Sequence, residues 1–279
     1  MTAAPARAST PGARRRSSAA RRYGPPLILV AVLVAVWELY ARTSGVSPFV
    51  LPAPTQVVGS LWTFRSEALR HVVPTIIETG LGFALSITFA IVVAVALDRA
   101  EWARRAVEPL LVGSQTVPLV AIAPLVIVWF GFGLLPKVLV VILVTFFPIT
   151  IGLLDGFRST AADAATLMRS FGASSGQAFR KLRWPSALPA FFTGLRISAT
   201  YAVLAAVIAE YVGATEGLGI WIQLSQRSFR TDLVFAAIVL TAALSVALYA
   251  AVVAAERAVI PWWHASRALP SRSAPMEVR

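Results

Sequence analysis

Apolar residues fill six long stretches of the chain, and shorter polar segments separate them. An α-helix needs about 20 mostly apolar residues to cross a hydrocarbon core about 30 Å thick, and most of these stretches approach or exceed that length. The pattern therefore predicts an all-α polytopic membrane protein with about six transmembrane helices. The expected spans are 26–41, 76–97, 110–130, 136–154, 190–212 and 233–255.

Prolines interrupt two of the expected spans. Pro118 and Pro124 fall within the third span, and Pro148 falls within the fourth. Prolines are tolerated inside a helical bundle because neighbouring groups satisfy the carbonyls that they leave free. We therefore keep both proline-containing stretches as spans.

The composition agrees with a membrane protein and excludes several kinds of site. Hydrophobic residues make up 57% of the 279 residues and charged residues only 14%, whereas soluble domains carry about 25% charged residues. The chain has no cysteine, which excludes disulfides and thiolate metal sites. Its two histidines, His71 and His264, lie far apart without metal-ligand spacing, so we expect interfacial surface residues at both positions.

The basic residues predict the orientation. If both termini are cytoplasmic, 18 of the 25 Lys and Arg residues lie in the cytoplasmic segments and six lie in the external ones. This asymmetry follows the positive-inside rule. The net charge of +12 is therefore explained by the basic residues that flank the spans on the cytoplasmic side. We expect the lipid bilayer as a partner and no nucleic acid.

Three regions follow from this topology. Residues 1–23 are expected to be a disordered basic cytoplasmic tail, and residues 24–258 the transmembrane domain. Residues 259–279 are expected to be a cytoplasmic C-terminal tail. The first apolar stretch has no small-residue cleavage site after it, which favours an uncleaved span over a signal peptide.

The cytoplasmic segment of about 158–189 is too ordered in pattern for a simple connector. A helix is expected over 161–171, and Gly172 permits a sharp turn after it. Ser174 or Ser175 can cap a second short helix that runs through Lys181. We expect Trp184-Pro185 and Leu188-Pro189 to stop that helix and start the next span.

This helix–turn–helix segment, which we call the elbow, admits two interpretations. It can be a docking element for a cytoplasmic partner, with its apolar side chains against that partner. It can also be an amphipathic helix on the membrane surface, with basic residues on phospholipid and Phe179 and Trp184 at the interface.

The elbow resembles the cytoplasmic coupling loop of the membrane subunits of binding-protein-dependent ABC importers. The similarity is to the nitrate/sulfonate/taurine and hydroxymethylpyrimidine (thiamine precursor) group. Gly172 matches the glycine of that loop and Leu188-Pro189 its Leu-Pro, but Thr166 stands where the family has a glutamate. Residues 117–133, Leu51-Pro-Ala-Pro-Thr55 and the Glu216-Gly-Leu-Gly219 turn extend the resemblance over roughly 51–255.

The resemblance implies a type I ABC importer permease fold and a transport role without enzyme activity. A separate ATPase subunit would use ATP, this chain would bind no cofactor, and the sequence contains no P-loop motif. The implied partners are that ATPase, an extracytoplasmic substrate-binding protein and a second copy of the chain, in the bacterial inner membrane. The implied cargo is a small polar solute, with a pyrimidine or thiamine precursor favoured and nitrate, sulfonate or taurine as the alternative.

Two sets of site residues follow. Within the elbow we expect Phe171, Phe179 and Leu182 to form an apolar plug with a charged rim around it. The residues expected to couple to the ATPase are Arg169, Phe171, Gly172, Ala173, Gln177, Phe179, Arg180, Lys181, Leu182, Pro185 and Pro189. Polar residues at membrane depth are candidates for the translocation path, namely Gln115, Thr116, Glu78 and Glu210, although structural partners or interfacial solvation can also account for them.

Two further interpretations remain. Residues 212–232 are too polar to span and are expected to form an external interfacial helix anchored by Trp221.

The alternative to a transport role is a non-transporting membrane scaffold, which would use the elbow only to recruit a partner. The proline-broken third span argues against a scaffold, which has no need of a weakened helix.

Overall fold

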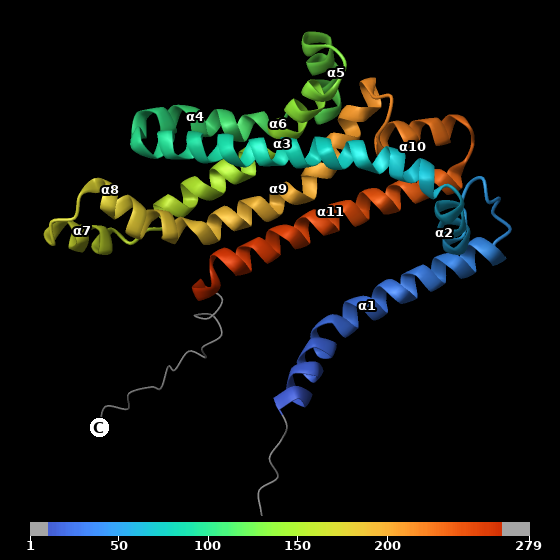
Figure 1. Ribbon diagram of the computed structural model, residues 1–279, viewed down its shortest axis with the longest axis horizontal. Coiled ribbons are helices and arrows are strands. Elements are labelled where there is room, and N and C mark those ends of the chain that lie inside the picture. Colours follow the sequence, from blue (N-terminus) through green and yellow to red (C-terminus); the bar gives the residue numbers. More distant parts are fainter. Residues whose placement is uncertain (1–10, 264–279) are drawn as a thin grey trace, which may run out of the picture.

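The computed structural model describes residues 11–263, and within them every regular element is helical (Figure 1). The all-α prediction is thereby confirmed. The helices are α1 Pro11–Thr43, α2 Pro54–Thr63, α3 Arg65–Arg99, α4 Glu101–Ser114, α5 Leu119–Phe130, α6 Leu134–Arg158, α7 Ala162–Ser170, α8 Ser175–Ala178, a π-helical turn Phe179–Arg183, α9 Trp184–Gly213, α10 Leu218–Arg227 and α11 Thr231–Val259.

The core of the molecule is formed by α3, α6, α9 and α11, which run alongside one another (Figure 1). Small residues let α6 and α9 approach closely. A Cβ on Gly194 would lie 2.3 Å from the carbonyl oxygen of Pro148, and one on Gly156 would lie 2.7 Å from Ala187. Close approach through small residues is typical of helix packing in membranes, where apolar side chains gain little by leaving lipid.

The third expected span is not one straight helix. It is replaced by α4 and α5, which are bent by 104° at the break between them. Pro118 ends the break: it lacks a backbone donor and disfavours helical geometry at the residue before it. Five helices of the described chain are long and apolar enough to cross a membrane, and the count reaches the expected six if the bent pair is one span.

Helix α1 lies apart from the bundle along most of its length and approaches it near α2 (Figure 1). Its apolar side chains are exposed, as expected for a helix that faces lipid. A link to α2 is made by Glu38, which accepts hydrogen bonds from the backbone N–H (3.0 Å) and Oγ1 (2.9 Å) of Thr55. The segment Leu51-Pro-Ala-Pro-Thr55 therefore ends at the contact that joins the two helices.

The ends of the chain differ in part from expectation. Helix α1 begins at Pro11, inside the stretch for which a disordered tail is expected, since Ala and Arg have high helix propensity. Residues 1–10 and 264–279 lie outside the described residues, and with them His264 and most of the expected C-terminal tail.

Candidate functional site

The turn of the elbow forms as expected. Helix α7 ends at Ser170, and Gly172 follows with a φ of +80°, in the region that favours glycine. Ser174 then caps α8: its Oγ accepts from the N–H of Gln177 (3.3 Å), and its own N–H donates to Oε1 of Gln177 (2.8 Å). This reciprocal pair is a capping box, which stabilises the start of a helix.

The expectation that Trp184-Pro185 and Leu188-Pro189 stop the second helix is wrong, and Pro189 lies inside α9. The chain stays helical from Ser175 to Gly213, so that α8, the π-helical turn and α9 form one continuous rod. Within the π-helical turn the N–H of Trp184 donates to the carbonyl of Phe179, five residues back. The wider turn accommodates Pro185, which cannot donate and would otherwise crowd the carbonyl of Lys181.

Aromatic packing fixes the base of the elbow to the bundle. The ring of Phe179 lies 5.6 Å from that of Phe157 and 6.2 Å from that of Trp184. Phe179 therefore packs on the spans and does not project as a plug, and Leu182 is half-buried. Of the three expected plug residues, only Phe171 projects freely, with 82% of its surface exposed.

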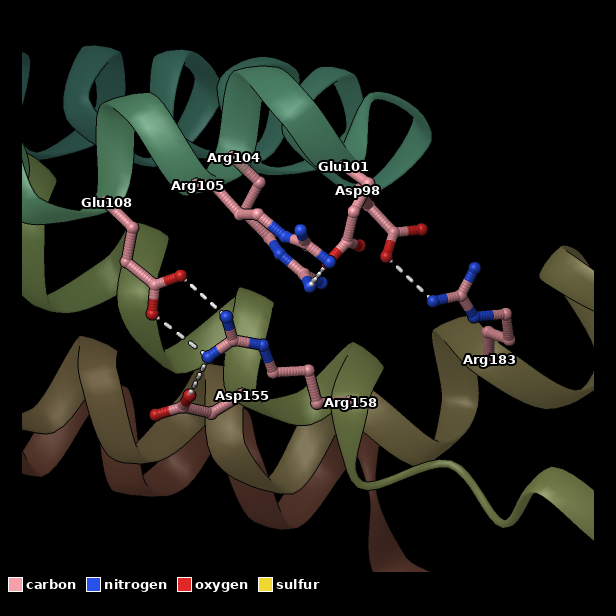
Figure 2. A network of polar contacts seen from close by, with 8 residues as sticks. All are labelled: Asp98, Glu101, Arg104, Arg105, Glu108, Asp155, Arg158 and Arg183. Carbon is pink, nitrogen blue, oxygen red and sulfur yellow. Dashed lines mark hydrogen bonds and ion pairs between the residues drawn. The ribbon is translucent and has the colours of Figure 1, made fainter.

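Ion pairs reinforce the same end of the molecule (Figure 2). Arg183, in the π-helical turn, donates to Oδ1 of Asp98 at the end of α3 (2.7 Å). Arg158, at the end of α6, makes two hydrogen bonds to Glu108 of α4 (2.6 and 2.9 Å). These contacts tie the rod that carries the elbow to α3, and tie α6 to α4.

The remaining expected coupling residues divide into exposed and half-buried groups. Ala173, Pro185 and Pro189 are half-buried near the turn and the base. The exposed residues of the elbow surface are Arg169, Gly172, Gln177, Arg180 and Lys181.

A hollow of about 560 Å³ opens on the side of the bundle between α6 and α9. Gln115, at the break between α4 and α5, lines it as expected, together with Thr193 and Tyr201 of α9 and Asp155 of α6. Thr116 is not among its lining residues; its hydroxyl donates to the carbonyl of Gly113 (2.7 Å). The contribution of α9 was not predicted, although Thr193, Ile197 and Tyr201 recur at the four-residue spacing of one helix face.

Glu78 and Glu210 do not line this hollow. Glu78 is buried in α3 and accepts from Nζ of Lys137 in α6 (2.5 Å). Glu210 is buried in α9, where it accepts from Oγ1 of Thr75 (2.5 Å) and from the N–H of Gly219 (2.6 Å). Both carboxylates therefore have structural partners, and Glu210 satisfies a backbone donor at the start of α10.

The expectations for His71 and Trp221 as interfacial residues are wrong. Both are buried, with exposed fractions of 6% and 1%, and their rings stack at 5.7 Å. Nδ1 of His71 accepts from the N–H of Gly217 (3.1 Å). The cause is the fold-back of α10 onto α3 and α9, which the Gly217 turn requires: its φ is +137°, and a Cβ there would lie 2.3 Å from the carboxyl carbon of Glu210.

No metal site is formed by the described residues: no three His, Asp or Glu side chains converge among them. The site consists of three parts along the continuous helix Ser175–Gly213. The exposed elbow lies at one end, the polar-lined hollow lies beside the helix, and the buried polar cluster around Glu210 lies at the other end. Such an arrangement can transmit motion along a helix and can offer a path to a solute, but it holds no constellation for covalent catalysis.

Comparison with known proteins places this architecture among transport proteins. Residues 86–261 match the family described as binding-protein-dependent transport system inner membrane component. The chain is 38% identical to the formylaminopyrimidine transport permease protein ThiX of Halalkalibacterium halodurans, over 85% of this chain and 95% of that protein. It is 32% identical to the taurine transport system permease protein TauC of Escherichia coli, over 84% and 87% respectively.

A solved structure has a similar fold. A chain of the MetNI methionine ABC transporter in an inward-facing conformation matches with a TM-score of 0.57 and 19% identity. The match covers 72% of this chain and 98% of that one.

Proposed function

The chain belongs to the family of binding-protein-dependent transport system inner membrane components, and from this premise we propose that it moves a small pyrimidine-type solute inward as half of a homodimeric ABC importer. It is a transmembrane ABC transporter permease, and it is not an enzyme. In the proposal, an ATPase subunit on the cytoplasmic side uses ATP, and an extracytoplasmic binding protein delivers the solute. Both termini then lie in the cytoplasm of a bacterial cell.

The observation that carries the coupling role is the continuous helix from Ser175 to Gly213. A partner that pushes on α8 pushes directly on α9, because the helix is continuous between them. Phe171 offers a large exposed apolar side chain to that partner, while Phe179 and Arg183 hold the base of the rod against Phe157 and Asp98. A rigid lever with an exposed tip is what rigid-body switching between inward-open and outward-open states requires.

The hollow beside α9 is the proposed part of the translocation path. It combines a break in the helices at Gln115 with polar groups from Thr193 and Asp155 and the ring of Tyr201. Irregular backbone at membrane depth is tolerated where it lines a cavity. A flat heterocycle can stack on an aromatic ring and exchange hydrogen bonds with the amide and hydroxyl groups.

The substrate proposal is a formylaminopyrimidine or a related thiamine precursor. Support comes from the 38% identity to a permease named for formylaminopyrimidine transport, compared with 32% to one named for taurine transport. The alternative is an importer of the nitrate, sulfonate or taurine type. A scaffold without transport is disfavoured because a scaffold needs no polar-lined hollow beside its coupling rod.

The test is uptake by proteoliposomes that contain the chain with its ATPase and binding protein. We expect ATP-dependent accumulation of labelled formylaminopyrimidine and none of labelled taurine. A matched preparation with a hydrolysis-deficient ATPase should accumulate neither. Uptake of taurine alone would contradict the proposed substrate but would agree with a permease role. ATP hydrolysis that never moves any solute would favour the scaffold.

A further inference from the structure

The start of α10 is held by three side chains that belong to α3 and α9. Three consecutive backbone N–H groups each donate to one of them: Gly217 to Nδ1 of His71 (3.1 Å), Leu218 to Oγ1 of Thr75 (3.0 Å) and Gly219 to Oε2 of Glu210 (2.6 Å). The N–H groups at the start of a helix have no acceptor within that helix, so these side chains supply what α10 lacks. We call the three acceptors the α10 seat.

Among these acceptors, His71 is the one that a proton abolishes. A backbone N–H can only donate, so Nδ1 of His71 carries no proton in this structure and the neutral ring has its proton on Nε2. In a charged imidazole both nitrogens are donors, and an N–H would then face the N–H of Gly217. The hydroxyl of Thr75 does not titrate, and a protonated carboxyl group at Glu210 would still keep an acceptor oxygen.

The ring of His71 is enclosed by the contact between α3 and α10. Its exposed fraction is 6%, and it stacks on Trp221 of α10 with 7° between the ring planes. A charge placed there is poorly solvated, and the N–H of Gly217 is left buried without an acceptor. The cost of charging the ring therefore falls on the contact that holds α10.

The charged groups around His71 do not replace the lost acceptor. They are Glu67 and Arg70 of α3, Glu216 of the turn before α10 and Glu210 of α9, with the pair Glu78–Lys137 two turns further along α3. Arg70 already donates to Glu216 (2.7 Å), and Glu210 already accepts from Gly219. Within residues 11–263 the ring of His71 is the acceptor for Gly217, and no second one takes part.

The docking of α10 already includes one unfavourable feature. The indole N–H of Trp221 is buried without an acceptor among the described residues, which lowers the stability of the docked helix. Apolar packing of Leu218, Trp221 and Ile222 offsets this cost. A second unsatisfied donor, at Gly217, would weaken the same short helix, and such segments open locally before the rest of a fold does.

We propose that His71 is an acid-sensitive latch: the neutral ring holds the start of α10 against α3, and its protonation releases the start of α10 from the seat. The docked state is then complete at high pH and weakens as the pH falls through the range in which histidine gains its charge, from about 8 to about 5. Histidines whose protonation changes a contact between elements act as pH switches. The proposal depends on contacts within one chain and not on the solute or on the ATPase.

The experiment measures the exposure of α10 at different pH values, with the full chain in lipid nanodiscs. Because the chain has no cysteine, Ser225→Cys places a single thiol in α10 at a position that is 4% exposed. Its rate of modification by a small thiol reagent is divided by that of Ser228→Cys, an exposed position after α10, which corrects for the effect of pH on the thiol. We expect this ratio to rise roughly tenfold or more between about pH 8 and about pH 5.

Two further variants separate the latch from other causes. His71→Asn replaces the ring by an amide whose oxygen accepts without titrating, so the ratio should stay low at both pH values. Ser86→Cys, buried in α3 about four turns from His71, should stay unreactive at both, because α10 alone is released. An unchanged ratio with His71 present, an equal rise with His71→Asn, or a rise at Ser86→Cys would overturn the proposal.

Nitrogen NMR of isotope-labelled histidine gives a measurement that leaves His71 in place. The chain has two histidines, so His264→Gln leaves the signals of one ring. We expect the neutral ring to carry its proton on Nε2 at about pH 8, and its protonation to coincide with the rise in the thiol ratio. A neutral ring with its proton on Nδ1, or a ring that stays neutral while α10 opens, would contradict the latch.

Discussion

At the scale of single residues, Lys137 and Glu78 form a buried ion pair. Only 10% of the lysine side chain and 3% of the glutamate side chain are exposed, so each charge depends on the other. Removing one member of a buried ion pair leaves an uncompensated charge and costs far more than removing both. The pair joins α3 to α6, beside the carboxylate of Glu210 that holds the start of α10.

We expect Lys137→Met to lower the free energy of unfolding by about 3–5 kcal/mol, because Glu78 is left buried without its cation. The double variant Lys137→Met with Glu78→Gln should recover most of this loss. The unfolding midpoint in mild detergent measures both. Lys181→Met, at the chain's other lysine, is the control, since that side chain is exposed on the elbow. An equal loss in the single and double variants would show that the ion pair itself is not what stabilises the site.

At the scale of the elements, the elbow depends on one backbone position. Gly172 reverses the chain between α7 and α8 at a φ of +80°. A side chain has room there, since no atom lies within 4 Å of an added Cβ, so the constraint is the backbone and not a clash. The geometry of the tip, and with it the direction in which Phe171 points, follows from this residue.

We expect Gly172→Val to abolish coupling, because a β-branched residue in this conformation costs roughly 1–3 kcal/mol and the turn would rearrange. Transport should fall to background while the spans still insert, and substrate should no longer stimulate ATP hydrolysis. Gly172→Asn should retain coupling, since asparagine tolerates positive φ. The matched control is Gly176→Ala, because Gly176 lies in the same elbow and an added Cβ there also meets no atom within 4 Å. Normal substrate-stimulated ATPase activity in Gly172→Val would contradict the assignment of this turn to coupling.

At the scale of the whole molecule, the elbow and α10 lie at opposite ends of the bundle (Figure 1). The unequal distribution of Lys and Arg between the two ends predicts that the elbow is cytoplasmic. The chain has no cysteine, so a single introduced thiol reports on one position only.

We expect a membrane-impermeant thiol reagent added to intact cells to label Ser228→Cys and to leave Ser175→Cys unlabelled. Both serines are exposed, the first at the end of α10 and the second at the start of α8. After the membrane is opened, both should react, which controls for local accessibility. The opposite pattern in intact cells would invert the proposed orientation and remove the elbow from the cytoplasm.

Much of the site could be predicted from local patterns. The cap at Ser174, the turn at Gly172 and the position of Gln115 in a break all depend on residues within a few positions of each other. The continuation of the helix through Pro185 could not be predicted. A π-helical turn forms there in a segment whose side chains pack on Phe157 and pair with Asp98, neither of which is near in sequence.

By itself the sequence determined five of the six expected spans, the asymmetry of charge and the turn of the elbow, because hydrophobic length, charge count and turn chemistry are properties of short segments. Only the tertiary structure decided which polar side chains are buried against a hydrogen-bond partner and which remain exposed. His71, Trp221 and Glu210 meet through a turn more than 140 residues from His71, and one hollow brings together Arg99 of α3, Arg169 of α7 and Arg180 of the π-helical turn. Contacts of that kind depend on how the helices pack, and no periodicity along the chain encodes which side chains will face one another across them.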